Sequence, residues 1–259
     1  MSTGTLVFTK EGHIGILTLN NPDALNALPL EGWEELRETC FEIKKDPDVR
    51  VVVITGTGDR AFCTGTDLKK TAKMADESFV ATYFDWETYL SGLKMWKPTI
   101  AAINGFCIGG GLEMALACDL RVASSKASFA LTEVKVASLP GLGGMQRLIR
   151  TVPKAVAMKM ILGAERINAQ EAYRIGLISD VFEPEALMEN AMKIAAQIAA
   201  NAPLSVKAAK QACIVGADLP LDQAIMYDYM LWGILRDTED RLEGRKAFAE
   251  KRPPQYKGR

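Results

Sequence analysis

The alternation of apolar and polar residues predicts a β-hairpin followed by a helix at the start of the chain. Side chains alternate along residues 5–9 and 13–20, and Glu11-Gly12 between them supplies a turn. The run 29–45 has its apolar residues at helical spacing, with an acidic residue in its first turn. We therefore expect two hairpin strands and then an amphipathic helix.

Nearly continuous apolar runs predict three buried strands in the next part of the chain, as in a parallel sheet that is covered on both faces. These runs are residues 49–55, 99–103 and 120–123. A loop at 56–68 and a helix at 76–96 lie between the first two strands. A glycine turn, with a helix that begins near Gly110, lies between the last two. This order favours right-handed βαβ units in a layered α/β core.

Beyond residue 144 the strand pattern almost disappears and helical spacing takes over. The expected helices are residues 145–151, 154–162, 169–175, 184–200, 205–215, 221–235 and 238–250, and the one extended exception is 177–182. We expect an α/β core over residues 1–200 and a helical C-terminal region over 201–259, both within a single domain unit. The apolar run from about residue 202 suits an oligomerisation surface, and a helical lid on the same subunit fits equally well.

Composition limits the classes of function. The 259 residues are 48% hydrophobic, with a formal net charge of -1 and a pI near 6.0, so the chain can bury a sizeable core. Lys and Arg are spread along the chain, unlike the basic patch of a nucleic-acid-binding protein. The N-terminus lacks the pattern of a signal or transit peptide, and we expect a cytoplasmic protein. Glycines and Asn104 interrupt the apolar stretch 99–118, which argues against a membrane span.

Metal and histidine-based chemistry are disfavoured. The five cysteines are widely separated, no Cys-x-x-Cys occurs, and His13 is the single histidine of the sequence. His13 precedes an alternating strand, where a structural role is far commoner than a catalytic one. We therefore expect no metal and no redox cofactor, and most of the thiols as buried apolar groups in a reducing compartment.

The loop after the first buried strand has two possible interpretations. Residues 56–61 match G-x-G-x-x-A, but a dinucleotide site needs a helix to begin at those glycines, and the following FCTGTD is a poor helix start. The same loop could present the amide of Thr66 to a ligand, because Gly65 permits tight backbone geometry. A plain surface turn explains these residues too, and the sequence alone favours that interpretation.

Residues 104–147 hold the candidate chemistry. A triple glycine, 109–111, opens a helix, where free N–H groups attract an anion, although close packing explains such glycines equally well. Glu113 follows inside an apolar helix, and Glu133 lies in the apolar context FALTEV. Two such carboxylates suit acid–base chemistry next to a developing oxyanion. The alternatives are a rim position, or salt bridges to Arg121 for Glu113 and to Lys126 or Lys135 for Glu133.

The C-terminal run 241–259 carries seven basic residues and two acidic ones. A solvated tail is the ordinary explanation. Attraction to a phosphorylated ligand is the alternative.

Six blocks in order resemble the crotonase (enoyl-CoA hydratase/isomerase) superfamily over nearly the whole length. The blocks are NPDALNAL at 21–28, AFCTGTDL at 61–68, NGFCIGGGLEMALACD at 104–119, FALTE at 129–133, LPGLGGMQRL at 139–148 and EGRKAFAEKRPPQYKGR at 243–259. The resemblance implies a crotonase-type ββα-superhelix core with a helical C-terminal region. It also implies an acyl-CoA thioester as substrate and a homotrimer or homohexamer.

The resemblance carries roles to matching positions. The amides of Thr66 and Gly110 would form an oxyanion hole for the thioester carbonyl as it becomes an enolate. Glu113 and Glu133 would activate water and exchange a proton at the carbon next to that carbonyl. Further matches line the CoA pocket and bind the nucleotide end of CoA. They are Ala24, Leu25, Asp67 and Leu68 for the pocket, and Lys251 for the nucleotide end.

Three residues depart from the family pattern: Thr66 replaces alanine, Thr132 replaces proline and Ala137 replaces glycine. These changes leave the acyl group open, and the FALTE block and C-terminal segment also resemble members that act on polar acyl groups, including a carnitinyl-CoA dehydratase. The expected reaction is syn addition of water to a 2-enoyl-CoA. The alternatives are an enoyl-CoA isomerase, a carnitinyl-CoA-type dehydratase, and a non-catalytic acyl-CoA-binding or RNA-binding homologue.

Overall fold

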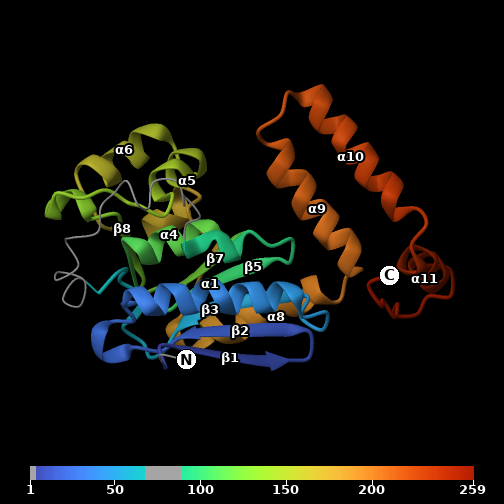
Figure 1. The fold of residues 1–259 in the computed structure, drawn as a ribbon, viewed down its shortest axis with the longest axis horizontal. Coiled ribbons are helices and arrows are strands. Elements are labelled where there is room, and N and C mark those ends of the chain that lie inside the picture. The colour runs from blue at the N-terminus through green and yellow to red at the C-terminus, as the bar shows by residue number, and fades with distance from the viewer. Residues whose placement is uncertain (1–3, 68–88) are drawn as a thin grey trace.

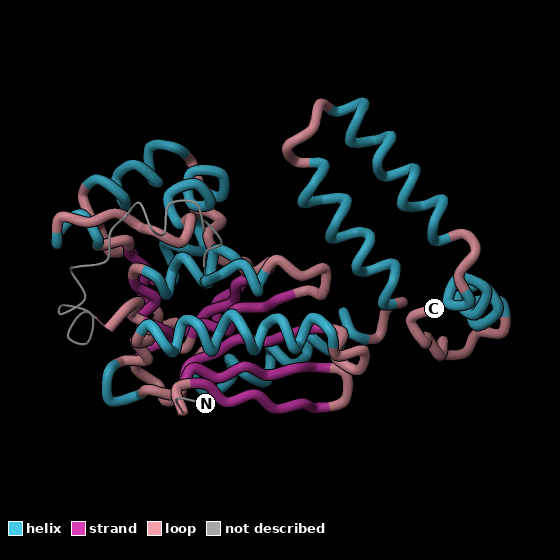
Figure 2. Tube along the Cα trace, viewed as in Figure 1, coloured by secondary structure: helices cyan, strands magenta, loops and turns pink. Residues whose placement is uncertain are grey.

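The structure is a computed structural model that describes residues 4–67 and 89–259. Its described strands form two sheets, and Figure 2 shows them gathered in one part of the molecule, apart from the last three helices. The larger sheet has the order β1-β2-β3-β5-β7-β10, and the smaller one has the order β4-β6-β8-β9. The mixed α/β class is therefore confirmed.

The larger sheet begins with the predicted hairpin. β1 (Leu6–Glu11) and β2 (Ile14–Leu19) pair antiparallel, and every later pairing in this sheet is parallel. The other strands are β3 (Val51–Gly56), β5 (Thr99–Ile103), β7 (Leu120–Ser124) and β10 (Asp180–Phe182). All three predicted buried strands are confirmed, and the predicted extended segment near residue 180 forms β10.

The apolar run of β3 reflects burial on both faces of the sheet. Val52 and Ile54 pack in one cluster with the buried side of α1 (Leu30–Lys45). Val51 and Val53 pack in a second cluster with α8 (Leu187–Ala199). Because consecutive side chains of a strand point to opposite faces, every position must be apolar when helices cover both.

The smaller sheet consists of short strands that the sequence pattern missed. They are β4 (Ala61–Cys63), β6 (Phe106–Ile108), β8 (Ser128–Ala130) and β9 (Ile167–Asn168). The prediction of a loop throughout 56–68 is therefore wrong at β4. Runs of two or three residues show no measurable periodicity, and long-range pairing rather than local preference makes them strands.

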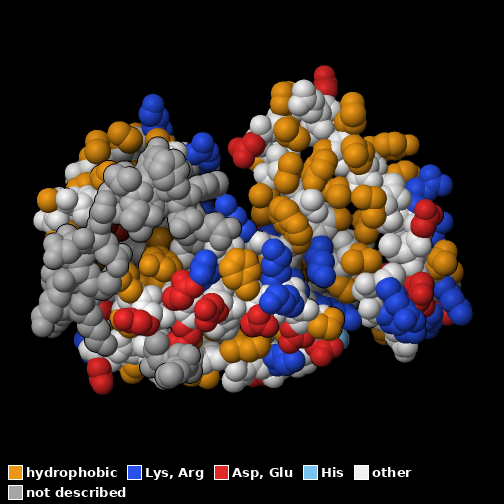
Figure 3. Space-filling view, in the orientation of Figure 1, with side chains coloured by type: hydrophobic (Ala, Val, Ile, Leu, Met, Phe, Trp, Pro, Cys, Tyr) orange, Lys and Arg blue, Asp and Glu red, His pale blue; other side chains and the backbone are white. Residues whose placement is uncertain are grey.

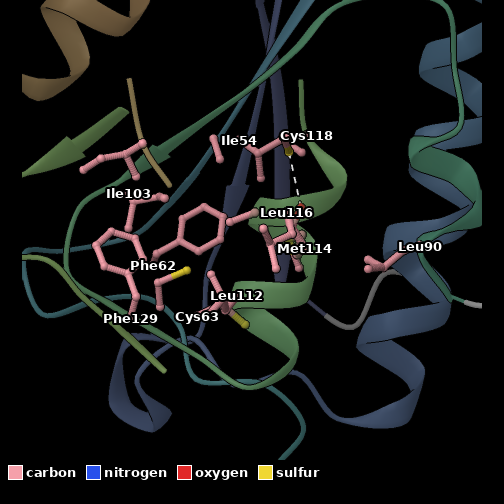
Figure 4. Close-up of a cluster of buried hydrophobic side chains, with 14 of the residues drawn as sticks. Ile54, Phe62, Cys63, Leu90, Ile103, Leu112, Met114, Leu116, Cys118 and Phe129 are labelled. Atoms are coloured by element: carbon pink, nitrogen blue, oxygen red, sulfur yellow. Dashed lines mark hydrogen bonds between the residues drawn. The ribbon is translucent and has the colours of Figure 1, made fainter. Parts of the chain in front are cut away.

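Helix α4 (Gly110–Ala117) follows β6 directly and is buried along most of its length. Figure 4 shows Leu112, Met114 and Leu116 of this helix among the side chains of Phe62 and Phe129. The apolar stretch 99–118 is thus two strands and a helix. None of the helices within residues 4–67 and 89–259 has the length and apolar character needed to cross a membrane.

The second half of the described chain is helical as expected. The helices are α5 (Gly144–Thr151), α6 (Lys154–Leu162), α7 (Ala169–Arg174), α8, α9 (Pro203–Gly216), α10 (Leu221–Leu235) and α11 (Glu239–Ala249), with a 3₁₀ turn at Pro184–Ala186 before α8. Of the predicted helix at 76–96, residues up to 88 lie outside the described part. Its last portion is the 3₁₀ helix Tyr89–Leu93 instead.

Helices α9, α10 and α11 project from the core as an arm (Figure 1). The expected boundary between residues 200 and 201 lies just before α9, and the division itself stays a prediction. Lys210 of α9 binds the core by an ion pair with Asp119 at 2.7 Å and a hydrogen bond to the carbonyl oxygen of Lys97 at 2.9 Å. Arg50 donates to the carbonyl oxygen of Tyr256 at 2.8 Å and so holds the C-terminal segment against β3.

We predict that Gly111→Ala destabilises the fold, because a Cβ there would lie 2.0 Å from the carbonyl oxygen of Cys63 in β4. Overpacking of this kind costs about 1–3 kcal/mol or more. Gly141→Ala is the control, since Gly141 is exposed and nothing lies within 4 Å of its added methyl group. Chemical denaturation should show a loss of stability for Gly111→Ala and little change for Gly141→Ala. Equal stability of the two variants would contradict the close contact.

Candidate active site

The four residues predicted to carry the chemistry line one cavity of about 470 Å³. Thr66 follows β4, Gly110 opens α4, Glu113 lies in the first turn of α4, and Glu133 follows β8. The parallel pairings β4–β6 and β6–β8 bring the three strand ends together. Ligands commonly bind at such carboxyl ends of parallel strands. The plain surface turn considered for Thr66 is therefore wrong.

Contacts from two other elements fix Thr66. The Leu28 amide donates to the carbonyl oxygen of Gly65, and the Asp67 amide donates to that of Leu28, both at 2.9 Å. Trp33 donates its indole N–H to Thr66 Oγ1 at 3.1 Å. Gly65 has a φ of +91°, which favours glycine. The hydrogen bonds of Gly65 and Asp67 thus fix the loop against Leu28. The Thr66 amide between them has no hydrogen-bond acceptor within the described residues.

The triple glycine provides both close packing and a free donor. A Cβ at Gly65 would lie 2.9 Å from the Gly110 nitrogen, so the two backbone segments touch. Gly109 has a φ of +56° and donates its amide to the carbonyl oxygen of Ala130 at 2.9 Å. Gly110 is the first residue of α4, and in the described part of the chain its amide has no acceptor. Both interpretations of these glycines are therefore compatible.

Glu113 is buried, with 2% of its surface exposed, and its carboxylate is held by backbone. Oε1 accepts hydrogen bonds from the amides of Leu142 at 2.7 Å and Gly144 at 2.8 Å. Burial raises the pKa of Glu113, and these two donors act in the opposite direction. With Oε1 held by two bonds, Oε2 is the oxygen that can meet a ligand.

The rim and salt-bridge alternatives for Glu113 are wrong. Arg121 donates instead to the carbonyl oxygens of Leu177 and Cys118, at 2.7 and 2.8 Å. The cation nearer to Glu113 is Arg147, whose charge lowers the pKa of that carboxyl. Arg147 also donates to the carbonyl oxygen of Leu142 at 2.7 Å and so braces the loop that binds Glu113.

Glu133 is half-buried and begins the 3₁₀ helix Glu133–Val136. Its Oε2 is buried and has no hydrogen-bond partner, and burial raises the pKa of this carboxyl. Neither Lys126 nor Lys135 forms an ion pair with it among the described residues. A buried, unpaired oxygen is costly unless a ligand uses it. The charge of Glu133 also raises the pKa of Glu113, so the two carboxylates interact.

The residues expected to bind CoA are only partly brought together. Ala24 ends the 3₁₀ helix Pro22–Ala24, and the carbonyl oxygen of Leu25 accepts from Thr64 Oγ1 of the cavity lining at 3.3 Å. Asp67 is next to Thr66, and Leu68 lies outside the described residues. Lys251 follows α11, which Figure 1 shows on the side of the molecule away from α5 and α6. One chain therefore does not bring Lys251 to its own cavity.

Sequence reasoning missed the residues that hold the catalytic candidates. Trp33 lies in the predicted amphipathic helix 29–45, and its indole also binds Thr66. Leu142 and Gly144 lie in the block LPGLGGMQRL at 139–148, but nothing in that block identifies them as donors to Glu113. Backbone donors leave no mark in residue identity, so only the glycines hinted at this contact.

The other sequence features considered above form no second ligand site in the described residues. Residues 56–61 join β3 to β4 and open no helix, which confirms that the G-x-G-x-x-A match is accidental. Part of the basic C-terminal charge is paired within its own segment, because Arg252 binds Glu243 and Glu250, and Arg259 binds Glu239. Within residues 4–67 and 89–259, no group of three or more His, Cys, Asp or Glu side chains is arranged so that it could hold a metal ion.

Comparison with known proteins agrees with this geometry. Residues 9–259 match the enoyl-CoA hydratase/isomerase family. The chain is 56% identical to an (E)-benzylidenesuccinyl-CoA hydratase of Thauera aromatica, over 95% of this chain and 96% of that protein. It is 40% identical to a 2,3-dehydroadipyl-CoA hydratase of Escherichia coli, over 98% and 99%.

Solved structures give the same result. The chain superposes on an enoyl-CoA hydratase from Bacillus anthracis with a TM-score of 0.91 and 37% identity, over 98% of this chain and 100% of that one. The sequence blocks, the fold and the cavity thus agree with full-length relatives. This chain belongs to the enoyl-CoA hydratase/isomerase family.

Proposed function

We propose that this chain catalyses the reversible syn addition of water to a 2-enoyl-CoA thioester. The observation that carries the proposal is the meeting of buried Glu113, half-buried Glu133 and two backbone amides without an acceptor in the described residues around one cavity. The two hydratases named above act on acyl groups of the succinyl and adipyl type, each of which has a carboxylate besides the thioester. The reaction moves only protons and water, so it needs no redox cofactor or metal.

The amides of Thr66 and Gly110 would stabilise the enolate. Addition of water to C3 of the enoyl group sends the π electrons of the C2=C3 bond to the thioester oxygen. Two fixed N–H groups at that oxygen favour the charged intermediate over the neutral substrate, and each such donor contributes on the order of 10²–10³ in rate. The contact of the Gly65 and Gly110 backbones keeps the two donors on one side of the cavity.

Glu113 and Glu133 would divide the proton transfers. Glu113, with Oε1 held by two amides, accepts the proton that water loses as its oxygen bonds to C3. Glu133 delivers a proton to C2 from its buried Oε2. One proton is taken and one is given, so the net change is the addition of H and OH. Because burial raises both pKa values and the charges repel, the pair can retain one proton.

The rival reactions use the same cavity differently. An isomerase moves a proton along the acyl chain and in principle needs one carboxylate, so the paired glutamates favour hydration or its reverse. The reverse includes a dehydratase of the carnitinyl-CoA type. A non-catalytic homologue would bind acyl-CoA without turnover, and the paired buried carboxylates argue against it.

We predict that Glu113→Gln and Glu133→Gln each lower kcat for crotonyl-CoA hydration by about 10²–10⁴-fold, because general acid–base catalysis contributes that much. Loss of the conjugated-thioester absorbance measures the rate. Glu189→Gln on the exposed side of α8 is the control and should keep full activity. Full activity of Glu113→Gln would remove its role in water activation, and turnover of a 3-enoyl-CoA by that variant would favour the isomerase.

We predict a bell-shaped dependence of kcat/KM on pH, with both apparent pKa values above 4.5, the ordinary value of a glutamate. Activity rises with pH as Glu113 loses its proton, and falls as Glu133 loses its own. Burial raises both pKa values, so both limbs of the pH profile lie at higher pH than the ordinary pKa of a glutamate. The two apparent values belong to the interacting pair and not to either residue alone. Measured stability across the same range separates titration from unfolding. A single acid limb at the ordinary value would contradict this assignment.

We also propose that the chain assembles as a homotrimer or a dimer of trimers in the cytoplasm. Figure 3 shows apolar side chains gathered over α9 and α10, and six of those on α10 are more than half exposed. They are Leu221, Ile225, Met226, Tyr229, Met230 and Ile234. Five free thiols suit a reducing compartment. In such an assembly Lys251 could bind the nucleotide end of CoA in a neighbouring cavity, with Ala24, Leu25 and Asp67 along its pocket.

We predict that the double change Tyr229→Glu and Met230→Glu shifts the chain to a smaller species in size-exclusion chromatography with light scattering. Both side chains are more than half exposed on α10, and buried charge at an interface is strongly unfavourable. Leu162→Glu on α6 adds charge at another exposed apolar position and is the control. A wild-type chain that elutes as a monomer would contradict the proposed assembly.

A further inference from the structure

Lys135 lines the cavity, and the proposed reaction does not use its positive charge. Among the described residues of the cavity lining, Lys135 is the only basic side chain. It belongs to the 3₁₀ helix Glu133–Val136, and its amide donates to the carbonyl oxygen of Thr132 at 3.0 Å. Its ammonium group has no acidic partner in the described part of the chain. Lys135 can therefore receive an anionic group of a ligand.

We propose that Lys135 selects an acyl group with a second carboxylate, distal to the thioester. This inference rests on the proposed function, since it places the thioester between the amides and the two glutamates. A substrate with a free carboxylate would bring a further negative charge to a cavity that already holds the Glu113–Glu133 pair. Coulombic repulsion would oppose its binding unless a cation faced it. Lys135 supplies that charge.

The position of Lys135 along the chain favours an acyl carboxylate over a CoA phosphate. Lys135 is the second residue after Glu133, and two residues of 3₁₀ helix advance the chain by about 4 Å. The backbone of Lys135 thus lies close to that of Glu133, and its long, exposed side chain can reach an acyl chain whose C2 faces Glu133. The phosphates of CoA are separated from the thioester by the whole pantetheine arm.

The rest of this wall can hold the carbon chain between the two charges. Val136, Leu139 and Leu142 line the cavity beside Lys135, and Trp33 and Tyr89 line it as well. A wall of apolar side chains with one charged group gives orientation, because only one end of the acyl group can pair with the ammonium. Such a pair contributes more to specificity than to the chemical step.

Binding of two non-reactive thioesters tests the proposal without catalysis. Adipyl-CoA and hexanoyl-CoA have six acyl carbons each and differ in the distal carboxylate. Isothermal titration calorimetry of Lys135→Met should show adipyl-CoA bound about tenfold more weakly, and hexanoyl-CoA changed by less than twofold. Lys135→Arg should retain most of the adipyl-CoA affinity. Added salt should reduce the difference between wild type and Lys135→Met in their affinity for adipyl-CoA.

Lys126→Met is the matched control, because Lys126 is exposed and is not part of the cavity lining. It should leave both affinities unchanged. If Lys135→Met weakens the binding of both ligands equally, Lys135 binds CoA itself and the proposal is overturned. If the variant weakens the binding of neither ligand, the proposal is overturned as well. Turnover of two substrates separates the two proposals. If neither crotonyl-CoA nor 2,3-dehydroadipyl-CoA is hydrated but the affinity difference is found, the proposed reaction fails while the carboxylate-binding role of Lys135 holds.

Discussion

The close approach of two backbone segments underlies the whole site. Residues 63–66 after β4 lie against the start of α4, where a Cβ at Gly111 would meet the Cys63 carbonyl and a Cβ at Gly65 would meet the Gly110 nitrogen. Without side chains at these glycines, the loop and the helix can touch. The contact turns two ordinary amides into a pair that faces one cavity. A methyl group at either contact would separate the donors, so packing and function impose the same requirement here.

The carboxylates depend on a different constraint, which is the cost of burying charge. Glu113 is tolerated in the core because two amides of the 142–144 turn bind one of its oxygens. Glu133 has a buried oxygen without such compensation. Burial raises the pKa of each, and a carboxyl whose pKa approaches the working pH exchanges protons most effectively. The destabilisation is local, and the two-sided core around β3 stabilises the fold that holds the pair.

The arm has the opposite character, with few buried side chains and a large apolar surface. Neither α9 nor α10 contains a fully buried residue in the single chain, whereas α8 packs four against the sheet. Apolar helices with so little cover are typical of surfaces that pack against another chain. The cavity and the arm thus meet different requirements. One needs rigid backbone around a small volume, and the other needs a broad apolar face.

The sequence by itself determined the long elements, the family resemblance and four of the residues that line the cavity, namely Thr66, Gly110, Glu113 and Glu133. Periodicity and buried runs define α1, β3, β5 and the C-terminal helices, since each spans enough residues to show a pattern. Tertiary structure alone decided the short strands of the second sheet, the hydrogen bond from Trp33 to Thr66 and the choice of the amides that bind Glu113. Backbone groups make most of these contacts between segments distant in sequence. Every residue except proline offers the same donor, so residue identity cannot reveal which amide meets which oxygen.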